Sequence, residues 1–246
     1  MSSNLTSSQI EQLQSVELVS FDLDDTLWPL ESVLIAAEQA QYDWLETNAP
    51  RITADLSMQD VMSRRTEFLS TRPDLTGDVT AMRKESLHHL FNAFDYSDTE
   101  SHDMVNTVFE IFYRARSQIT LFDDALECLQ TLKTQYKLAA LTNGNADLDI
   151  AGIAHLFDDA RFATLDTPAK PDVTMFHQCA SALGVDPKNM LHVGDNVETD
   201  VGGGQRAGAL TAWYNPEGKP WPDSLPSPTL ELTCLDDLVS FLPRVT

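Results

Sequence analysis

Two aspartates after an apolar segment are the residues of this sequence best suited to chemistry. Asp22 and Asp24 stand two positions apart after residues 17–21, and Thr26 follows them. Side chains alternate along an extended chain, so both carboxylates would point the same way at a strand's end, where they could share a magnesium ion and a phosphate. Like charges there repel and lose hydration, so they need a cation or a chemical task. The pattern indicates phosphoryl transfer through a covalent aspartate, with an acidic turn or helix cap as an equal alternative.

A second polar tip follows the apolar residues 138–141. Thr142, Asn143 and Gly144 supply a hydroxyl, an amide and a backbone without a side chain. Together these groups could donate hydrogen bonds to phosphate oxygens. Taken alone, the segment is better interpreted as a turn, because Asn-Gly is a frequent turn dipeptide.

A lysine precedes a predicted helix in the third segment. Pro171 suits the first turn of that helix, and Gly184 suits its end. A cation just before a helix does not complement the helix dipole. We therefore expect Lys170 to face Asp22 and a bound phosphate, although a surface position is the default for any single lysine.

The fourth segment has two acids after another apolar run. Asp195 follows residues 190–194, and Asp200 comes five positions later, near a predicted helix start. Asp195 can ligate magnesium through oxygen, and Asp200 can hold that ligand shell or the lysine in place. An acid in the first turn of a helix is also ordinary capping. A site is therefore indicated by the four segments together rather than by any one of them.

In this order, the four segments resemble the four motifs of the haloacid dehalogenase-like hydrolase superfamily, over residues 15–27 and about 120–240. The resemblance implies that Asp22 is a nucleophile that forms an aspartyl-phosphate, and that Asp24 is the general acid and base. It also implies Mg2+ bound by the Asp22 carboxylate, the Asp24 carbonyl and Asp195. The other implied roles are phosphate binding by Thr142, Asn143 and Gly144, catalysis by Lys170, and support by Thr26, Asp200 and Asn196.

An acid at position 24 favours phosphate esters over haloacids. A dianionic phosphate repels an attacking carboxylate, and magnesium with the Lys170 ammonium would offset that repulsion. Asp24 must carry a proton at neutral pH, whereas free aspartate titrates near about 3.9, so we expect burial and the Asp22 charge to raise its pKa. Halide leaves without a proton, and similar dehalogenases lack both this acid and the metal site. A non-enzymatic receiver domain, phosphorylated on aspartate, is another alternative.

Composition limits both the fold and the partners. The chain has 246 residues and a net charge of -22, and its length allows one full α/β core plus an inserted module. Nucleic acid and anionic membranes would be repelled, and local cations must attract a phosphate substrate. We predict a doubly wound, mostly parallel, Rossmann-like α/β sheet with the site outside the carboxyl ends of its strands.

Residues 28–118 read almost entirely as helix. One helix is enough to join two parallel strands, so this insertion exceeds what the topology requires. We interpret residues 28–118 as a helical cap that selects the leaving group, and residues 1–27 with 119–246 as the α/β core. The predicted helices of the insertion cover residues 57–70, 79–94 and 100–116.

Arginines concentrate positive charge in the insertion. Pairing with a nearby acid is the simpler interpretation for each of them. Arg83 is the exception, and we predict that it binds substrate. The segment Asp-Val-Thr-x-x-Arg at 78–83 resembles one in the flavin and pyrimidine nucleotide phosphatase branch. That resemblance implies FMN or a riboflavin-pathway phosphate as the leading substrate, with a sugar phosphate, phosphoglycolate or a nucleoside monophosphate as alternatives. The five arginines are Arg64, Arg65, Arg83, Arg114 and Arg116.

Several remaining features have structural interpretations. Glycines 202–204 follow an acidic motif and suit close packing of a helix on the sheet rather than dinucleotide binding. His192 is expected to be a hydrogen-bonded core residue. No apolar run is long enough to span a bilayer, and we expect a cytoplasmic monomer or homodimer. The cysteines, expected to be free thiols, are Cys128, Cys179 and Cys234.

Overall fold

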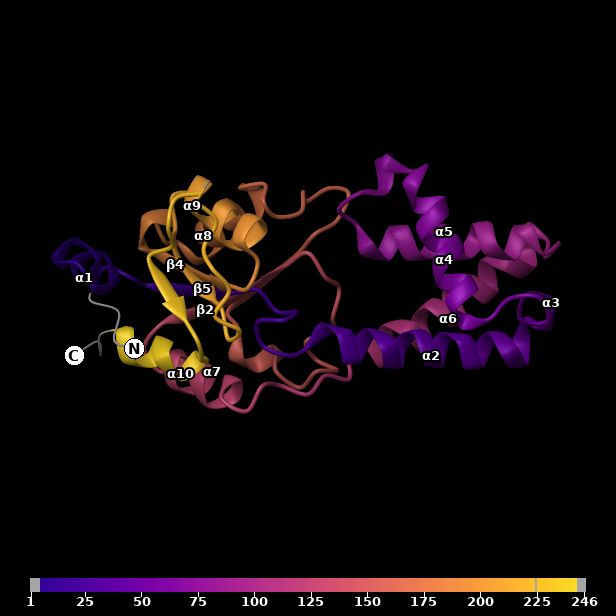
Figure 1. The fold of residues 1–246 in the computed structure, drawn as a ribbon, viewed down its shortest axis with the longest axis horizontal. Helices are drawn as coiled ribbons and strands as arrows, with labels where there is room; N and C mark the ends of the chain where they lie inside the picture. Colours follow the sequence, from indigo (N-terminus) through magenta and orange to yellow (C-terminus); the bar gives the residue numbers. More distant parts are fainter. Residues whose placement is uncertain (1–4, 224, 243–246) are drawn as a thin grey trace.

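A six-stranded parallel sheet is the central element of the computed structural model, which describes residues 5–223 and 225–242 (Figure 1). The strand order is β3-β2-β1-β4-β5-β6, so the chain moves outward from β1 in one direction and then in the other. Doubly wound sheets place ligands at such a reversal. The predicted fold class is confirmed. The strands are β1 Leu18–Phe21, β2 Lys137–Thr142, β3 Asp159–Phe162, β4 Met190–Gly194, β5 Leu210–Tyr214 and β6 Leu230–Leu232.

Helices cover both faces of the sheet. Val19 packs on one face with Leu129 of α7 and Leu238 of α10, whereas Leu18 packs on the other face with Phe176 of α8. Successive residues of β1 thus enter different hydrophobic clusters, as the alternation of side chains along a strand requires. The helices outside the insertion are α1 Ser7–Gln14, α7 Ala125–Lys133, α8 Thr174–Leu183, α9 Gly203–Arg206 and α10 Leu235–Phe241, with short turns η2 Ala154–Leu156, η3 Pro187–Asn189 and η4 Val197–Gly202.

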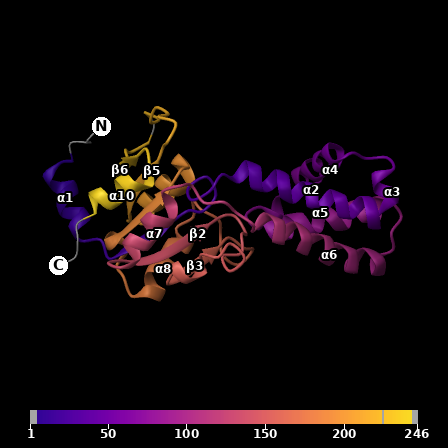
Figure 2. The same ribbon diagram turned by 90° about the horizontal axis from the view of Figure 1, so that it is seen from below.

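The insertion between β1 and β2 is helical and has a hydrophobic cluster of its own. Figures 1 and 2 show its helices extending away from the sheet, on the side opposite α1. Phe91 of α5 is fully buried with Leu45 and Val108 in this cluster. The three predicted helices are confirmed as α4, α5 and α6. The elements are α2 Leu30–Asn48, α3 Pro50–Thr53, α4 Met58–Ser70, η1 Pro73–Leu75, α5 Val79–Ala93 and α6 Asp98–Arg116.

The start of α8 differs from the prediction. The helix begins at Thr174, so Pro171 lies before it, in a cis peptide with Lys170, and not in its first turn. The Asp172 side chain accepts a hydrogen bond from the Thr174 N–H, which marks the helix start three residues beyond the proline. The predicted end is confirmed, because Gly184 adopts the left-handed conformation with φ 66°.

The structural interpretations of the glycines and cysteines are confirmed. A Cβ on Gly204 would lie 2.8 Å from the Thr211 side chain of β5, so only glycine allows α9 to approach the sheet this closely. Cys128 and Cys179 are buried free thiols, and Cys234 is a partly exposed one. Among the described residues, no helix combines the length and apolar character needed to cross a membrane.

Candidate active site

The loops after β1, β2 and β4 surround a cavity of about 460 Å3 that faces the insertion. Parallel neighbours end at the same edge of a sheet, which brings residues from distant parts of the sequence together there. The core lines the cavity with the predicted residues Asp22, Asp24, Thr142, Asn143, Gly144, Lys170, Asp195, Asn196 and Asp200, and the insertion adds Leu30, Leu34, Val79, Arg83, Phe112 and Arg116.

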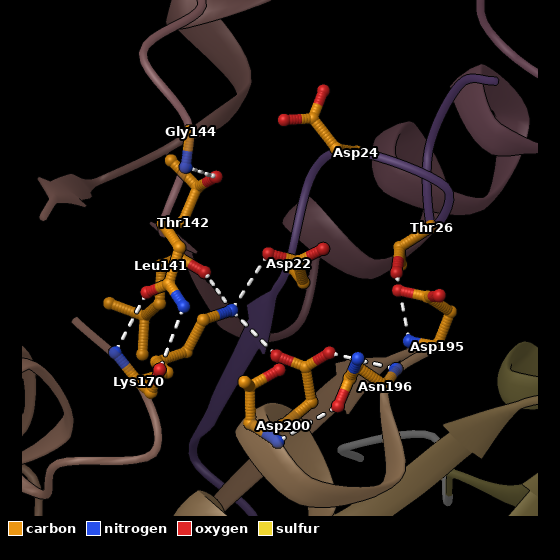
Figure 3. A network of polar contacts seen from close by, with 12 residues as sticks. Asp22, Asp24, Thr26, Leu141, Thr142, Gly144, Lys170, Asp195, Asn196 and Asp200 are labelled. Atoms are coloured by element: carbon orange, nitrogen blue, oxygen red, sulfur yellow. Dashed lines mark hydrogen bonds and ion pairs between the residues drawn. The ribbon is translucent and has the colours of Figure 1, made fainter. Parts of the chain in front are cut away.

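A buried lysine joins two of the carboxylates. The Lys170 ammonium donates to Asp22 Oδ1 at 2.7 Å, to Asp200 Oδ1 at 2.6 Å and to the Leu141 carbonyl at 2.5 Å (Figure 3). Burial alone would lower the pKa of Lys170, but Asp200 and Asp22 raise it, so the ammonium stays charged. Burial raises the pKa of Asp22 well above 3.8, although Lys170 opposes the shift. The cluster therefore holds a carboxylate that is poorly stabilised, beside a fixed cation.

Asp200 is the firmly ionised member of this cluster. Burial would raise its pKa, but the Lys170 and His192 contacts hold it at about 2. Its Oδ2 accepts the Asn196 N–H at 3.0 Å, and His192 Nε2 lies 3.3 Å from Oδ1. Burial lowers the pKa of His192 to about 4, and its other ring nitrogen lies 2.8 Å from Ser20 Oγ. His192 is thus the hydrogen-bonded core residue that was predicted, and it also supports Asp200.

The loop after β2 holds the lysine in place through its backbone. The Asn143 side chain accepts the Lys170 N–H at 2.7 Å and donates to the Lys170 carbonyl at 2.8 Å. Thr142 Oγ1 accepts the Gly144 N–H at 2.9 Å, which tightens the turn. The Asn143 amide is therefore engaged with the lysine segment, while all three residues still line the cavity.

Asp24 has different partners from Asp22. Its Oδ2 accepts from Arg116 of α6 at 2.5 Å, and its Oδ1 accepts from Trp28 Nε1 at 2.9 Å. Burial raises its pKa, as predicted, while Arg116 and Trp28 lower it. The predicted contribution of the Asp22 charge is not among the main causes, since Asp25 is the neighbouring acid that adds to the shift.

The acidic residues fit a magnesium ion by their donor chemistry. Carboxylate oxygens of Asp22, Asp195 and Asp200 lie within 4.8 Å of one another. Burial, followed by Asp200 and Asp25, raises the pKa of Asp195 to about 7, and the Lys170 charge only partly opposes this shift. Both oxygens of Asp200 already accept hydrogen bonds, which leaves Asp22 and Asp195 as the better ligands. A hard cation with oxygen ligands suits this set.

Thr26 and Asn196 support the loop that carries Asp195. The buried Thr26 hydroxyl accepts the Asp195 N–H at 3.1 Å. The Asn196 side chain accepts two N–H groups at 3.0 Å, from Glu198 and Thr199, and so caps η4. Trp213 Nε1 donates to the Asp195 carbonyl at 2.8 Å. These contacts fix the loop backbone and leave the Asp195 carboxylate at the cavity.

Two arginines of the insertion pair with the same buried acid. Arg83 donates to Glu38 at 2.8 Å and lies over the Phe112 ring, while it also lines the cavity. Arg65 pairs with the same Glu38, at 2.6 Å. The acid pairing that is the simpler interpretation for helix arginines therefore applies to Arg83 as well. Whether Arg83 also binds substrate stays a prediction.

Arg116 is the site residue that sequence reasoning did not single out. A signal was present, because Arg65, Arg83 and Arg116 have no acid three or four positions away on their own helices. Arg114, by contrast, pairs with Glu110 one turn earlier, and acids stand at positions 60 and 67 around Arg64. An arginine without a local partner is the one expected to reach across to another element.

Comparisons with known proteins place this chain among hydrolases. A family model described as haloacid dehalogenase-like hydrolase matches residues 16–208. The 5-amino-6-(5-phospho-D-ribitylamino)uracil phosphatase YigB of Escherichia coli is 29% identical, over 94% of this chain and 98% of that protein. Pyrimidine 5'-nucleotidase YjjG of Escherichia coli is 29% identical over 54% of this chain and 62% of that protein. The crystal structure of a 2-haloacid dehalogenase from Pseudomonas syringae has a TM-score of 0.85 and 33% identity, covering 92% of this chain and 98% of that one.

Proposed function

This chain belongs to the haloacid dehalogenase-like hydrolases, and we propose that it is a phosphoric monoester hydrolase, which hydrolyses a small phosphate ester with Mg2+ through a phosphorylated Asp22. The observation that carries the proposal is the contact of Lys170 with Asp22 and Asp200 at the base of the cavity. A carboxylate with a raised pKa beside a fixed ammonium is suited to attack an anionic phosphorus.

The first step transfers the phosphoryl group to the protein. An Asp22 oxygen attacks phosphorus, the Asp22 O–P bond forms, and the ester P–O bond breaks on the opposite side. The leaving oxygen takes the electron pair of that bond and a proton from the Asp24 carboxyl. Lys170 offsets the repulsion between the carboxylate and the phosphate, and the backbone of Thr142 to Gly144 lies beside the phosphoryl oxygens.

The second step releases phosphate. A water attacks phosphorus while Asp24 takes its proton, and the bond between phosphorus and Asp22 breaks. This step restores Asp22 as a carboxylate and Asp24 as an acid. Asp22, Asp195 and the Asp24 carbonyl would hold Mg2+, with Asp200, Asn196 and Thr26 as support. When bound, the ion supplies positive charge that neutralises the phosphoryl oxygens.

The leading substrate we propose is FMN or a phosphate of the riboflavin pathway. Similarity to YigB supports it. A second, mostly apolar cavity of about 530 Å3 adjoins the first, because Leu30, Leu34 and Arg83 line both. Met58 and Met62 of α4 contribute to it, and thioether side chains pack well against aromatic rings. A ring system joined to phosphate by a chain fits two adjoining cavities, with Arg83 between them.

Smaller substrates are the alternatives. A sugar phosphate, phosphoglycolate or a nucleoside monophosphate would use the same core residues and occupy the first cavity. We further propose that residues 28–118 act as a cap on the core formed by 1–27 and 119–246, and that the protein works in the cytoplasm as a monomer or homodimer. A net charge of -22 supports the expected absence of nucleic acid and membrane partners.

Dehalogenation is the second candidate, supported by the similarity to the Pseudomonas syringae structure. The acid at position 24 and the acidic cluster at the strand ends favour ester hydrolysis, because a halide leaves without a proton. The match to a hydrolase family over residues 16–208 argues against the alternative of a non-enzymatic receiver domain.

The test is phosphate release from FMN, p-nitrophenyl phosphate and a panel of sugar phosphates, with and without Mg2+. We expect magnesium-dependent turnover by the wild type and by Asp123→Asn, an exposed surface control, and none by Asp22→Asn. Halide released from 2-chloropropionate with no ester hydrolysed would refute the proposal. Faster turnover of sugar phosphates than of FMN would retain the phosphatase and reject the flavin substrate.

A further inference from the structure

One ion pair connects the insertion directly to the loop after β1. Arg116, the last residue of α6, donates to Asp24 Oδ2 at 2.5 Å, and the two side chains are 3% and 15% exposed. Trp28 donates to the other oxygen of Asp24. The Asp24 carboxyl is therefore held from both sides, by Trp28 of the same loop, which packs in the hydrophobic cluster of the sheet, and by Arg116 at the end of α6.

The surroundings of this pair are shaped to allow it. A Cβ on Gly144 would clash with Asp24 Oδ2 and would lie 2.9 Å from Arg116 Nη2, so the turn after β2 leaves the space that the pair occupies. The other amino nitrogen of Arg116, Nη1, is buried without a hydrogen-bond partner among the described residues. A guanidinium that gives up hydration and leaves one donor unpaired adds little to stability. The arrangement needs another reason.

The direction of phosphoryl transfer supplies that reason. Asp22 lies at the end of β1, whereas Arg83, Phe112 and Arg116 line the cavity from the insertion, which extends beyond the sheet. The leaving oxygen departs opposite the attacking one, so it faces the insertion. Figure 3 shows the Asp24 carboxylate turned away from Lys170 and Asp22. Asp24 is thus directed towards the side on which the leaving oxygen must lie.

We propose that Arg116 is a positioning residue for ester hydrolysis, which holds the Asp24 carboxyl on the leaving-group side of the cavity. This inference rests on the proposed function. Trp28 alone fixes one oxygen and leaves the carboxyl free to turn about that bond, whereas two donors fix its plane. Because Arg116 belongs to the insertion, the position of the general acid depends on the position of α6.

The test compares two leaving groups. An alkoxide needs a proton to leave, whereas nitrophenolate is a stable anion that does not. We expect Arg116→Met to lower kcat about a hundredfold for the best alkyl ester of the panel, since a misplaced catalytic group costs about that much. For p-nitrophenyl phosphate kcat should fall less than about threefold. KM for each ester should stay within about threefold of its wild-type value.

Companion variants isolate the cause. Arg114→Met, on the same helix but 67% exposed and paired with Glu110, should match the wild type on both esters. Arg116→Lys, which retains a cation, should recover much of the lost alkyl-ester turnover. In an Asp24→Asn background, Arg116→Met should cause no further loss on the alkyl ester, because the residue it positions is already gone. Thermal unfolding of each variant verifies folding, and added guanidinium chloride at millimolar level should restore Arg116→Ala.

Other results overturn the inference. Equal losses of kcat on both esters would make Arg116 a structural residue, and a rise in KM alone on both would make it a phosphate-binding residue. Additive losses in the Asp24→Asn background would also refute it. Wild-type protein that hydrolyses neither ester would overturn the proposed function and this inference together, which distinguishes the two failures.

Discussion

At the scale of single residues, the number of hydrogen-bond partners differs between the two carboxylates that Lys170 contacts. One ammonium contacts two buried carboxylates, Asp22 and Asp200. The pKa of Asp200, which also contacts His192 and accepts the Asn196 N–H, is lowered, whereas that of Asp22 is raised. Active sites commonly contain such a group, whose ionisation lowers the stability of the fold but makes the carboxylate more reactive.

Substitution should separate stability from activity at this cluster. A raised folded pKa means that the Asp22 carboxyl destabilises the fold as the pH rises from 3.8 through that pKa. Asp22→Asn should therefore lose turnover in the presence of Mg2+, while its free energy of unfolding at pH 7, measured without metal, stays equal to that of the wild type or rises. Lys170→Met should lose turnover and also about 3–5 kcal/mol of its free energy of unfolding, because two buried carboxylates lose their partner. Urea unfolding in EDTA measures this, and a less stable Asp22→Asn would contradict it.

His192 should make the protein sensitive to mild acid. Its pKa is about 4 in the fold against an ordinary 6.5, chiefly because of burial. Between these values the unfolded chain binds more protons, so the free energy of unfolding falls as the pH decreases through this window, by about 3 kcal/mol in total from this residue. Above pH 6.5 the contribution is constant.

Urea unfolding between pH 7.5 and 4 tests the His192 contribution. His192→Gln should flatten the pH dependence, and His102→Gln, at an exposed position of α6, should leave it unchanged. An identical slope for wild type and His192→Gln would assign the acid sensitivity to other groups.

At the scale of elements, buried charge connects the helices of the insertion. Glu38 of α2 accepts from Arg65 of α4 and Arg83 of α5, and only 5% of its side chain is exposed. Burial would raise its pKa, but these two hydrogen bonds and the arginine charges lower it below 4.5. Three helices from separate parts of the sequence are therefore connected through one carboxylate beside the cavity.

Removing that carboxylate should loosen the insertion. Glu38→Gln leaves two arginines facing a neutral amide, and we expect a loss of about 2–4 kcal/mol. Because the folded pKa is lowered, the stabilisation is present above pH 4.5 and is lost as the pH falls through the folded pKa. Chemical unfolding at pH 7 measures the loss, with Glu31→Gln on the exposed side of α2 as the control. Equal stability of the two variants would show that Glu38 contributes nothing.

At the scale of the whole molecule, the net charge of -22 adds to the repulsion between acids at the carboxyl ends of the strands, so cations are required there. Asp22, Asp195 and Asp200 meet there, and Lys170 is the buried ammonium beside them. One ammonium cannot neutralise three carboxylates, and Asp195, with a pKa of about 7, forms no ion pair with any residue that the structure describes. A divalent cation would complete the balance.

Metal removal should therefore change both turnover and stability. Dialysis against EDTA should abolish phosphate release, and returning Mg2+ should restore it. Because an ion that binds only the folded protein stabilises it, Mg2+ should also raise the Tm of the wild type. Asp195→Asn should lose this rise in Tm, and Asp186→Asn, on an exposed loop away from the cavity, should retain it. Full turnover in EDTA, or a Tm unaffected by Mg2+, would contradict the metal site.

Sequence by itself determined the sheet edge and much of the helical structure. Each polar tip directly follows an apolar strand, and parallel strands bring such tips to one edge whatever the details of packing. Thr142 and Asp195 could therefore be assigned to the neighbourhood of Asp22 without coordinates, whereas Lys170, eight residues after β3, was indicated by its charge just before a helix. Helices of the insertion have a local origin as well, in side-chain periodicity and capping residues such as Ser97.

Only the tertiary structure decided which charges meet. Arg116 reaches Asp24 across 92 positions of sequence, and Glu38 draws Arg65 and Arg83 from two other helices. The start of α8 at Thr174 was likewise settled by a side-chain contact of Asp172 rather than by the proline. Local patterns state which residues need a partner, but the choice of partner depends on how whole elements pack, since each long side chain has several within reach before the fold is formed.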